Sequence, residues 1–225
     1  MRKGFSFSNE GMEIRQGVLT SAELAAVKAD ISLQSDKLQT YGIRNLEKKF
    51  TSIATLANSP RVLSIATELL NKPVKLVRAI FFDKTPQSNW LVSWHQDKTV
   101  TLNQRHDLSG WGPWSLKDGV CHVQPPVAVL NEMVTIRLHI DDCDEHNGCL
   151  QVMPGSHQYG ILATESLQAL VKTSTSVACS VAAGDAVIMR PHIVHSSSKS
   201  QTNGHRRVVH LEYCSYELPP GLTWA

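Results

Sequence analysis

From residue 75 onward the chain is a series of short apolar or alternating segments separated by turn-forming pairs, and this pattern limits its fold more than any other feature. We expect strands at residues 77–82, 134–140, 150–153, 186–189 and 208–213. Pairs of residues that favour turns stand between them, namely Asn147-Gly148, Pro154-Gly155, Gly184-Asp185 and Asn203-Gly204. Short strands at this spacing predict antiparallel sheets, as in a barrel or a sandwich.

Before residue 75 the apolar residues repeat with the period of a helix. Thr20 or Ser21 can cap a first helix, whose apolar stripe is Leu24, Val27 and Ile31. Ser59 and Pro60 provide a cap and a first-turn proline for a second helix, which Asn71 can end. Its apolar side consists of Val62, Ile65, Ala66, Leu69 and Leu70. Helices first and strands afterwards predict a mainly β fold with N-terminal helices packed on one face.

The chain has 225 residues and no internal repeat or Pro/Gly-rich linker. We therefore expect one domain, with a mostly helical flank at residues 1–74 and a strand-rich core at 75–214. A segment at about 103–126 interrupts this core, and we expect it to be irregular because it is rich in Gly, Pro and Trp. A connection of this length is either a lid or an ordered cover, and the sequence leaves both open.

The composition is that of an ordinary folded protein, with 42% hydrophobic and 19% charged residues. The formal net charge of +2 is small and the basic residues are scattered, so nucleic acid and membranes are not expected partners. Residues 1–12 are polar and lack the apolar region of a secretory signal, so none is expected, and no apolar run approaches the ~20 residues that span a bilayer. The five cysteines include no C-x-x-C pair. We expect a cytoplasmic protein with reduced thiols.

His95 and Asp97 form an H-x-D pair that can bind a metal. Residues i and i+2 of an extended backbone point to the same side, so both side chains can meet one cation. Two imidazoles and one carboxylate on one face of an octahedron hold non-haem iron(II), and leave three positions for a chelating cosubstrate and dioxygen. The motif alone is a weak signal, because His139 and Asp141 form a second pair. In that amphipathic strand we expect His139 to be satisfied by a neighbour.

The third ligand is expected near the C-terminal end. His195 and Ser197 alternate onto one face, and Arg206 follows the Asn203-Gly204 turn, so a hairpin is expected to bring Arg206 back beside them. An arginine there can hold the distal carboxylate of a cosubstrate such as 2-oxoglutarate, supported by the serine hydroxyl.

Three other histidines compete with His195 for the role of third ligand. His192 falls on the opposite face from Ser197, and His205 sits in the turn. His210 shares a face with Arg206, but lies in an apolar strand with no matching anchor after it. His195 is therefore the preferred third ligand.

Several motifs in this order resemble the phytanoyl-CoA dioxygenase family between about residues 75 and 213. They are Trp94-His95-Gln96-Asp97, the stretch from Asp141-Asp142 to Asn147-Gly148, Pro154-Gly155-Ser156-His157, and His195-Ser196-Ser197 with Arg206. The resemblance implies a double-stranded β-helix, which is a jelly-roll or cupin-like barrel. It also implies iron(II) at His95, Asp97 and His195, and 2-oxoglutarate at Arg206 and Ser197.

The same resemblance implies the reaction. Halogenating relatives replace the carboxylate ligand with a small residue, whereas Asp97 is present here, so hydroxylation or a related oxidation is favoured. Dioxygen and 2-oxoglutarate would be consumed and succinate and CO2 formed, with ascorbate as a possible addition in vitro. The substrate is expected to be a small to medium organic molecule, and nothing indicates phytanoyl-CoA itself. The sequence does not indicate the oligomeric state.

Five further residues are candidates for contact with the cosubstrate or the substrate. Lys84 is assigned to the cosubstrate, and Arg137 to the substrate or to the layer around the metal ligands, because both come from strands near the expected cavity. Trp94, Trp111 and Trp114 come from the flanking segment and from the segment at 103–126. The ordinary alternatives are cations that reach into solvent and rings that cover the core.

Two other functions would use the same metal ligands. A cupin-like binding or sensor protein would hold the metal or 2-oxoglutarate without turnover. A zinc-dependent hydrolase or isomerase could use His95, Asp97 and His195, but would have no use for Ser197 and Arg206. The complete set therefore favours an oxygenase.

Overall fold

Two antiparallel sheets face each other in the protein, whose computed structural model describes residues 4–33, 43–117 and 119–225. The larger sheet has the strand order β1 (Met12–Arg15), β11 (Ala186–Met189), β8 (Met133–His139), β13 (Arg206–Cys214), β3 (Lys75–Lys84) and β2 (Ile43–Arg44). The smaller sheet has the order β10 (Val177–Ala178), β9 (Leu150–Val152), β12 (His195–Ser197) and β4 (Val92–His95). From β8 onward the chain passes to the smaller sheet and back twice, which places the β4 and β12 residues opposite β3 and β13.

Side chains alternate between two environments along the larger sheet. On β8, Ile136 and Leu138 belong to the core under the helices, whereas Thr135, Arg137 and His139 take the opposite positions between the sheets. The alternation predicted for this strand is confirmed. It places a buried arginine and a buried histidine inside the fold, where polar groups require partners.

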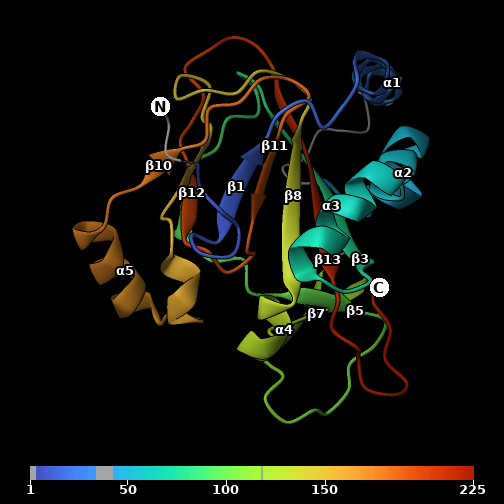
Figure 1. Cartoon of the computed structure of the whole chain (residues 1–225), viewed down its shortest axis with the longest axis vertical. Helices are drawn as coiled ribbons and strands as arrows, with labels where there is room; N and C mark the ends of the chain where they lie inside the picture. The colour runs from blue at the N-terminus through green and yellow to red at the C-terminus, as the bar shows by residue number, and fades with distance from the viewer. Residues whose placement is uncertain (1–3, 34–42, 118) are drawn as a thin grey trace.

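N-terminal helices pack on one face of the larger sheet, as predicted (Figure 1). Two of them, α1 (Ser21–Ser32) and α3 (Pro60–Leu70), are the predicted helices, whereas α2 (Thr51–Ala57) was not predicted. Thr20 and Glu23 form a capping box at the start of α1. The Ser59 hydroxyl accepts a hydrogen bond from Val62 N–H at the start of α3, and Asn71 ends this helix in the left-handed conformation. Both predicted helix starts are thus confirmed.

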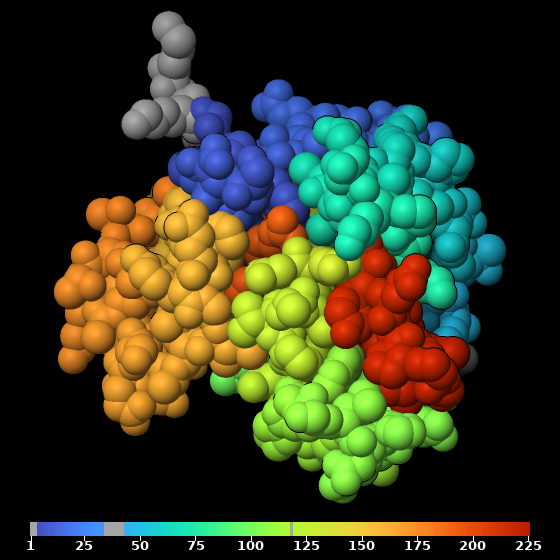
Figure 2. Space-filling view, turned by 60° about the horizontal axis from the view of Figure 1, so that its bottom comes forward, coloured from blue at the N-terminus to red at the C-terminus, as the bar shows by residue number. Residues whose placement is uncertain are grey.

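The expectation that residues 103–126 are irregular is wrong in part. This segment contributes β6 (Trp114–Lys117) and β7 (Val120–Val123) to a third sheet, in the order β5 (Val100–Leu102), β7 and β6. The chain end packs beside it, because Leu102 bridges to Trp224 and Asn103 N–H donates to Thr223 O at 3.0 Å (Figure 2). Hydrogen bonds along the third sheet satisfy the backbone of a segment that looks unstructured in sequence.

Two further helices were not anticipated: α4 (Val127–Asn131) and α5 (Thr164–Thr173), the latter on the opposite side of the molecule from α1–α3 (Figure 1). Short 3-10 turns are η2 (Leu46–Lys48) and η3 (Ser156–Tyr159). Across the described residues, no helix combines the length and the apolar character needed to cross a membrane. All five cysteines are free thiols.

Candidate active site

His95, Asp97 and His195 meet at one end of the smaller sheet. His95 ends β4 and His195 begins β12, and the two residues are directly paired in the ladder with ring centroids 4.2 Å apart. The Asp97 carboxylate reaches both rings, because Oδ1 lies 3.6 Å from His95 Nε2 and Oδ2 lies 3.6 Å from His195 Nε2. One ligand atom from each side chain lies within 4.8 Å of the other two, which is close enough for all three to bind one ion.

Backbone carbonyls fix the orientation of both imidazoles. His95 Nδ1 lies 2.8 Å from Ser93 O, and His195 Nδ1 lies 2.8 Å from Ile193 O. A carbonyl can only accept, so each Nδ1 must donate its hydrogen, and each Nε2 keeps its lone pair facing Asp97. This arrangement, in which the second nitrogen of a ligating histidine donates to a carbonyl, is usual around protein-bound metals. The residues present therefore fit a divalent cation.

The charge states of the triad also suit a cation. Burial lowers the pKa of His195 to about 4, so this imidazole is neutral near pH 7. Burial tends to raise the pKa of the Asp97 carboxyl, but the neighbouring His95 and His195 side chains outweigh that effect and lower it. For His95, the hydrogen bond and charge of Asp97 outweigh burial and raise the pKa. An ionised carboxylate thus stands between a neutral His195 ring and the His95 ring, which would release any proton on Nε2 when a metal binds.

The triad opens into a cavity of ≈ 480 Å³ between the two sheets. His95 and Asp97 remain 38% and 27% exposed, so their ligand atoms are accessible from it. Apolar side chains form part of the wall, namely Ile80, Phe82, Leu91, Val92 and Leu150. The charged groups that line it are Arg78, Arg137, Arg206 and Glu212, in addition to Asp97. The cavity is therefore both apolar and charged, as in many small-molecule sites.

Arg206 lines the same cavity and is almost fully buried. Its Nε has no hydrogen-bond partner. Beside it, Lys84 is directly paired with Arg206 in the ladder, and Lys84 Nζ lies 2.7 Å from Ser197 Oγ. Ser197 Oγ also donates to Gly148 O at 2.8 Å. A cationic, hydroxyl-bearing pocket with an unpaired donor is suited to a carboxylate.

The route by which Arg206 approaches Ser197 differs from the expected hairpin. Strands β12 and β13 pair with different partners and belong to different sheets, so the Asn203-Gly204 turn carries the chain from one sheet to the other. Lys84 spans the gap by binding Ser197 from the larger sheet. The residues meet because the sheets face each other, not because the two strands are neighbours.

The pH dependence of stability tests whether Lys84 is buried as an uncharged amine. Lys84 has no exposed surface, and burial together with the charge of Arg206 lowers its pKa to about 7. Between this value and the unfolded lysine pKa of ~10.4, the unfolded chain holds a proton that the folded chain lacks, so stability rises with pH. From about pH 7.5 to 8.5, the free energy of unfolding of the wild type should gain about 1 kcal/mol relative to Lys84→Met, measured by urea titration. Parallel pH profiles would show that Lys84 is charged in the fold.

A second group of side chains around Asp97 could also hold a metal and was not predicted from the sequence. His210 and Glu212 lie close enough to Asp97 to form another metal-capable cluster. However, both carboxylate oxygens of Glu212 bind Arg78, at 2.7 and 3.0 Å, and His210 Nε2 lies 3.0 Å from Glu212 Oε1. These atoms are already committed to one another, whereas the triad's Nε2 atoms face only Asp97. Arg206, His210 and Glu212 alternate onto one face of β13, and this spacing was the sequence signal that could have predicted the group.

The other histidines considered for the metal lie elsewhere. The second H-x-D pair does not form a ligand set with the triad, because Asp141 binds Arg207 at 2.7 Å. The expectation that a neighbour satisfies His139 is wrong, since neither of its ring nitrogens has a hydrogen-bond partner. His192 is buried beside His157, and His205 binds Asp83 at 2.8 Å.

The tryptophans proposed for substrate contact are not part of the cavity wall. Trp111 and Trp114 pack against the core under the third sheet, and Trp94 is absent from the residues that line the cavity. Trp90, which the sequence analysis did not select, does line it. Trp94 precedes His95 in β4, and successive residues of a strand point to opposite faces. Because His95 points into the cavity, Trp94 points away from it.

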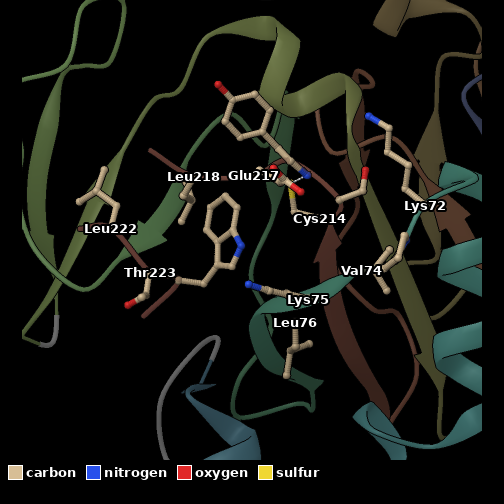
Figure 3. Close-up of a pocket in the computed structure, with 13 residues that line it drawn as sticks. Lys72, Val74, Lys75, Leu76, Cys214, Glu217, Leu218, Leu222 and Thr223 are labelled. Atoms are coloured by element: carbon tan, nitrogen blue, oxygen red, sulfur yellow. Dashed lines mark hydrogen bonds between the residues drawn. The ribbon is translucent and has the colours of Figure 1, made fainter. Parts of the chain in front are cut away.

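A larger cavity of ≈ 830 Å³ lies apart from the triad. Figure 3 shows Lys75 and Leu76 from the start of β3 on one side of it and Leu218 and Thr223 from the C-terminal segment on the other. The two cavities share no lining residue, and no histidine lines the larger one. Size alone therefore does not identify the chemical site.

The family model for phytanoyl-CoA dioxygenase (PhyH) matches residues 9–208. The chain belongs to this family, and with it to the superfamily of Fe(II)- and 2-oxoglutarate-dependent oxygenases. No match was found among curated proteins.

Solved structures share the fold. AviO1 from Streptomyces viridochromogenes Tue57 is 23% identical, with a TM-score of 0.71 over 95% of this chain and 94% of that one. The non-heme alpha ketoglutarate dependent carbocyclase SnoK from nogalamycin biosynthesis is 17% identical, with a TM-score of 0.71 over 93% and 81%. HygX from Streptomyces hygroscopicus, with nickel and 2-oxoglutarate bound, is 20% identical, with a TM-score of 0.67 over 92% and 84%. The expected jelly-roll fold is confirmed.

Proposed function

We propose that this protein is an Fe(II)- and 2-oxoglutarate-dependent dioxygenase that hydroxylates a small to medium organic substrate. His95, Asp97 and His195 would hold the iron. The observation that carries this assignment is the convergence of two imidazole Nε2 atoms on one carboxylate at 3.6 Å, with both rings fixed through Nδ1. When bound, iron with 2-oxoglutarate supplies the oxidative chemistry, in which dioxygen is consumed and succinate and CO2 are formed.

Arg206, Ser197 and Lys84 would bind the distal carboxylate of 2-oxoglutarate. Arg206 is buried with an unpaired Nε, and Ser197 lines the same cavity. Lys84 does not line it in this structure, and its amine donates to the Ser197 hydroxyl at 2.7 Å. A guanidinium binds a carboxylate through two parallel hydrogen bonds, which also orients the dicarboxylate along the cavity. The triad's free sides remain available to the oxo-acid end, because His95 and Asp97 are open to the cavity.

Hydroxylation is proposed because Asp97 keeps a carboxylate in the position where a halogenating relative would need space. The superfamily also supports other outcomes: SnoK is a carbocyclase, and SnoN from the same biosynthesis is an epimerase. The apolar wall of Ile80, Phe82 and Leu150 would exclude water from the reacting carbon.

A succinate assay tests this function. Purified protein with Fe(II), ascorbate and 2-oxoglutarate should release succinate under air and none under argon, and the true substrate should accelerate the release. Binding of 2-oxoglutarate without succinate, even across a broad panel of metabolites, would instead favour a non-catalytic binding or sensor protein. Turnover with Zn(II) in place of Fe(II), independent of oxygen, would contradict the proposal.

A further inference from the structure

Arg137 is a buried cation that lines the metal cavity without an anionic partner. Arg137 is 7% exposed, and its Nε has no hydrogen-bond partner. Nη1 lies 2.8 Å from His210 Nδ1, and the guanidinium carbon lies 5.5 Å from the centre of the Phe82 ring. Among the described residues no carboxylate forms a salt bridge with it. A buried charge without a counter-ion is costly, so this position requires an explanation.

The two carboxylates that line the cavity, those of Asp97 and Glu212, have other partners. Because His210 Nδ1 accepts from Arg137, His210 Nε2 donates to Glu212, which binds Arg78 through both oxygens. Glu212 therefore balances Arg78. Burial and the charge of Arg206 lower the pKa of Arg137 to about 10, which still leaves the guanidinium protonated near pH 7.

The proposed function does not supply the missing anion. A divalent metal would balance Asp97 and the oxo-acid carboxylate of 2-oxoglutarate, and Arg206 would balance the distal carboxylate. One positive charge, that of Arg137, is then left without a counter-ion in a cavity that also presents apolar side chains. An anion that enters after the cosubstrate would pair with it and also satisfy the free Nε.

Resting on the proposed function, we propose that Arg137 binds the carboxylate of the substrate, which is a carboxylic acid with an apolar body. Phe82 and Val92 offer apolar surface within the cavity, and Leu91, 61% exposed, extends that surface to the outside. The acid would be held at Arg137 while its hydrocarbon part lies along these side chains. Such two-point binding fixes which carbon faces the metal.

The test compares an acid with its neutral match on the loaded protein. Mn(II) replaces Fe(II) to prevent turnover, 2-oxoglutarate is added at saturation, and binding of octanoate and octanamide is measured by calorimetry. Octanoate should bind at least about tenfold more tightly, since one partner of a buried charge pair contributes that much or more. Arg137→Gln should remove this preference, and Arg137→Lys should keep part of it.

Arg190→Gln is the matched control, because Arg190 is a half-buried arginine that does not line the metal cavity, lies over the Phe7 ring at 4.1 Å, and also has its pKa lowered by burial to about 10. It should keep the preference for octanoate. Binding of 2-oxoglutarate by each variant shows that the variant is folded.

Each other outcome has a definite meaning. Equal binding of the two probes, binding of neither, or a preference that survives in Arg137→Gln would overturn the assignment. So would a loss in Arg137→Gln of 2-oxoglutarate affinity with octanoate unaffected, which would place Arg137 on the cosubstrate. Binding of 2-oxoglutarate to the wild type with Mn(II) is measured first. If it does not bind, the proposed function itself fails.

Discussion

Replacing Asp97 with alanine is expected to lower the affinity for Fe(II) by at least about 100-fold and to reduce oxygen-dependent succinate release to background. The Asp97 carboxylate lies 3.6 Å from each imidazole Nε2 atom, so its loss removes both a ligand and the negative charge at the centre of the site. Anaerobic calorimetry with Fe(II), or with Mn(II) as a stable substitute, measures the first effect.

Asp141→Ala is the matched control for this prediction. Asp141 ends the other H-x-D pair but binds Arg207, not the triad. Its removal should leave the metal affinity unchanged within a factor of about two, although the fold loses an ion pair. Equal losses in the two variants would show that general damage, rather than a lost ligand, explains the result.

Arg206→Ala is expected to weaken 2-oxoglutarate binding by roughly 30- to 1000-fold, because truncating one partner of a buried charge pair costs about 2–4 kcal/mol. Metal affinity should change little, since an arginine offers no ligand atom and the three ligand side chains are His95, Asp97 and His195. Calorimetric titration of the Mn(II) form with 2-oxoglutarate separates the two quantities.

The neighbouring Arg207 supplies the comparison. It follows Arg206 on β13, so its side chain takes the other face of the sheet, where it binds Asp141 at 2.7 Å. Arg207→Ala should bind 2-oxoglutarate like the wild type. If Arg206→Ala lowers the affinities for metal and cosubstrate equally, the assignment of Arg206 to the distal carboxylate is contradicted.

Local sequence signals, such as helix caps and alternation along a strand, were sufficient to predict the elements that carry them. The Thr20–Glu23 capping box and the Ser59-Pro60 start define α1 and α3, and alternation along β8 separates Ile136 and Leu138 from Arg137. Elements without such signals were missed. Helix α2 begins at Thr51 after Phe50, which provides no side-chain cap, and Ala163 likewise provides none for α5.

The residues of the candidate site were only partly predictable, because local sequence patterns do not show which distant strands pair with each other. H-x-D and H-x-S spacings pointed to His95, Asp97, His195 and Ser197. That β12 and β13 lie in different sheets, and that His210 consequently sits beside Asp97, follows from long-range register. The cavity-facing role of Arg137 likewise depends on His210 opposite it in the ladder.

Anomalous diffraction from crystals grown with Mn(II) and 2-oxoglutarate tests the central claim most directly. The account predicts one anomalous peak within coordination distance of His95 Nε2, His195 Nε2 and an Asp97 oxygen, with the distal carboxylate of 2-oxoglutarate on Arg206. A peak instead among Asp97, His210 and Glu212, or a cosubstrate that does not reach Arg206, would contradict it.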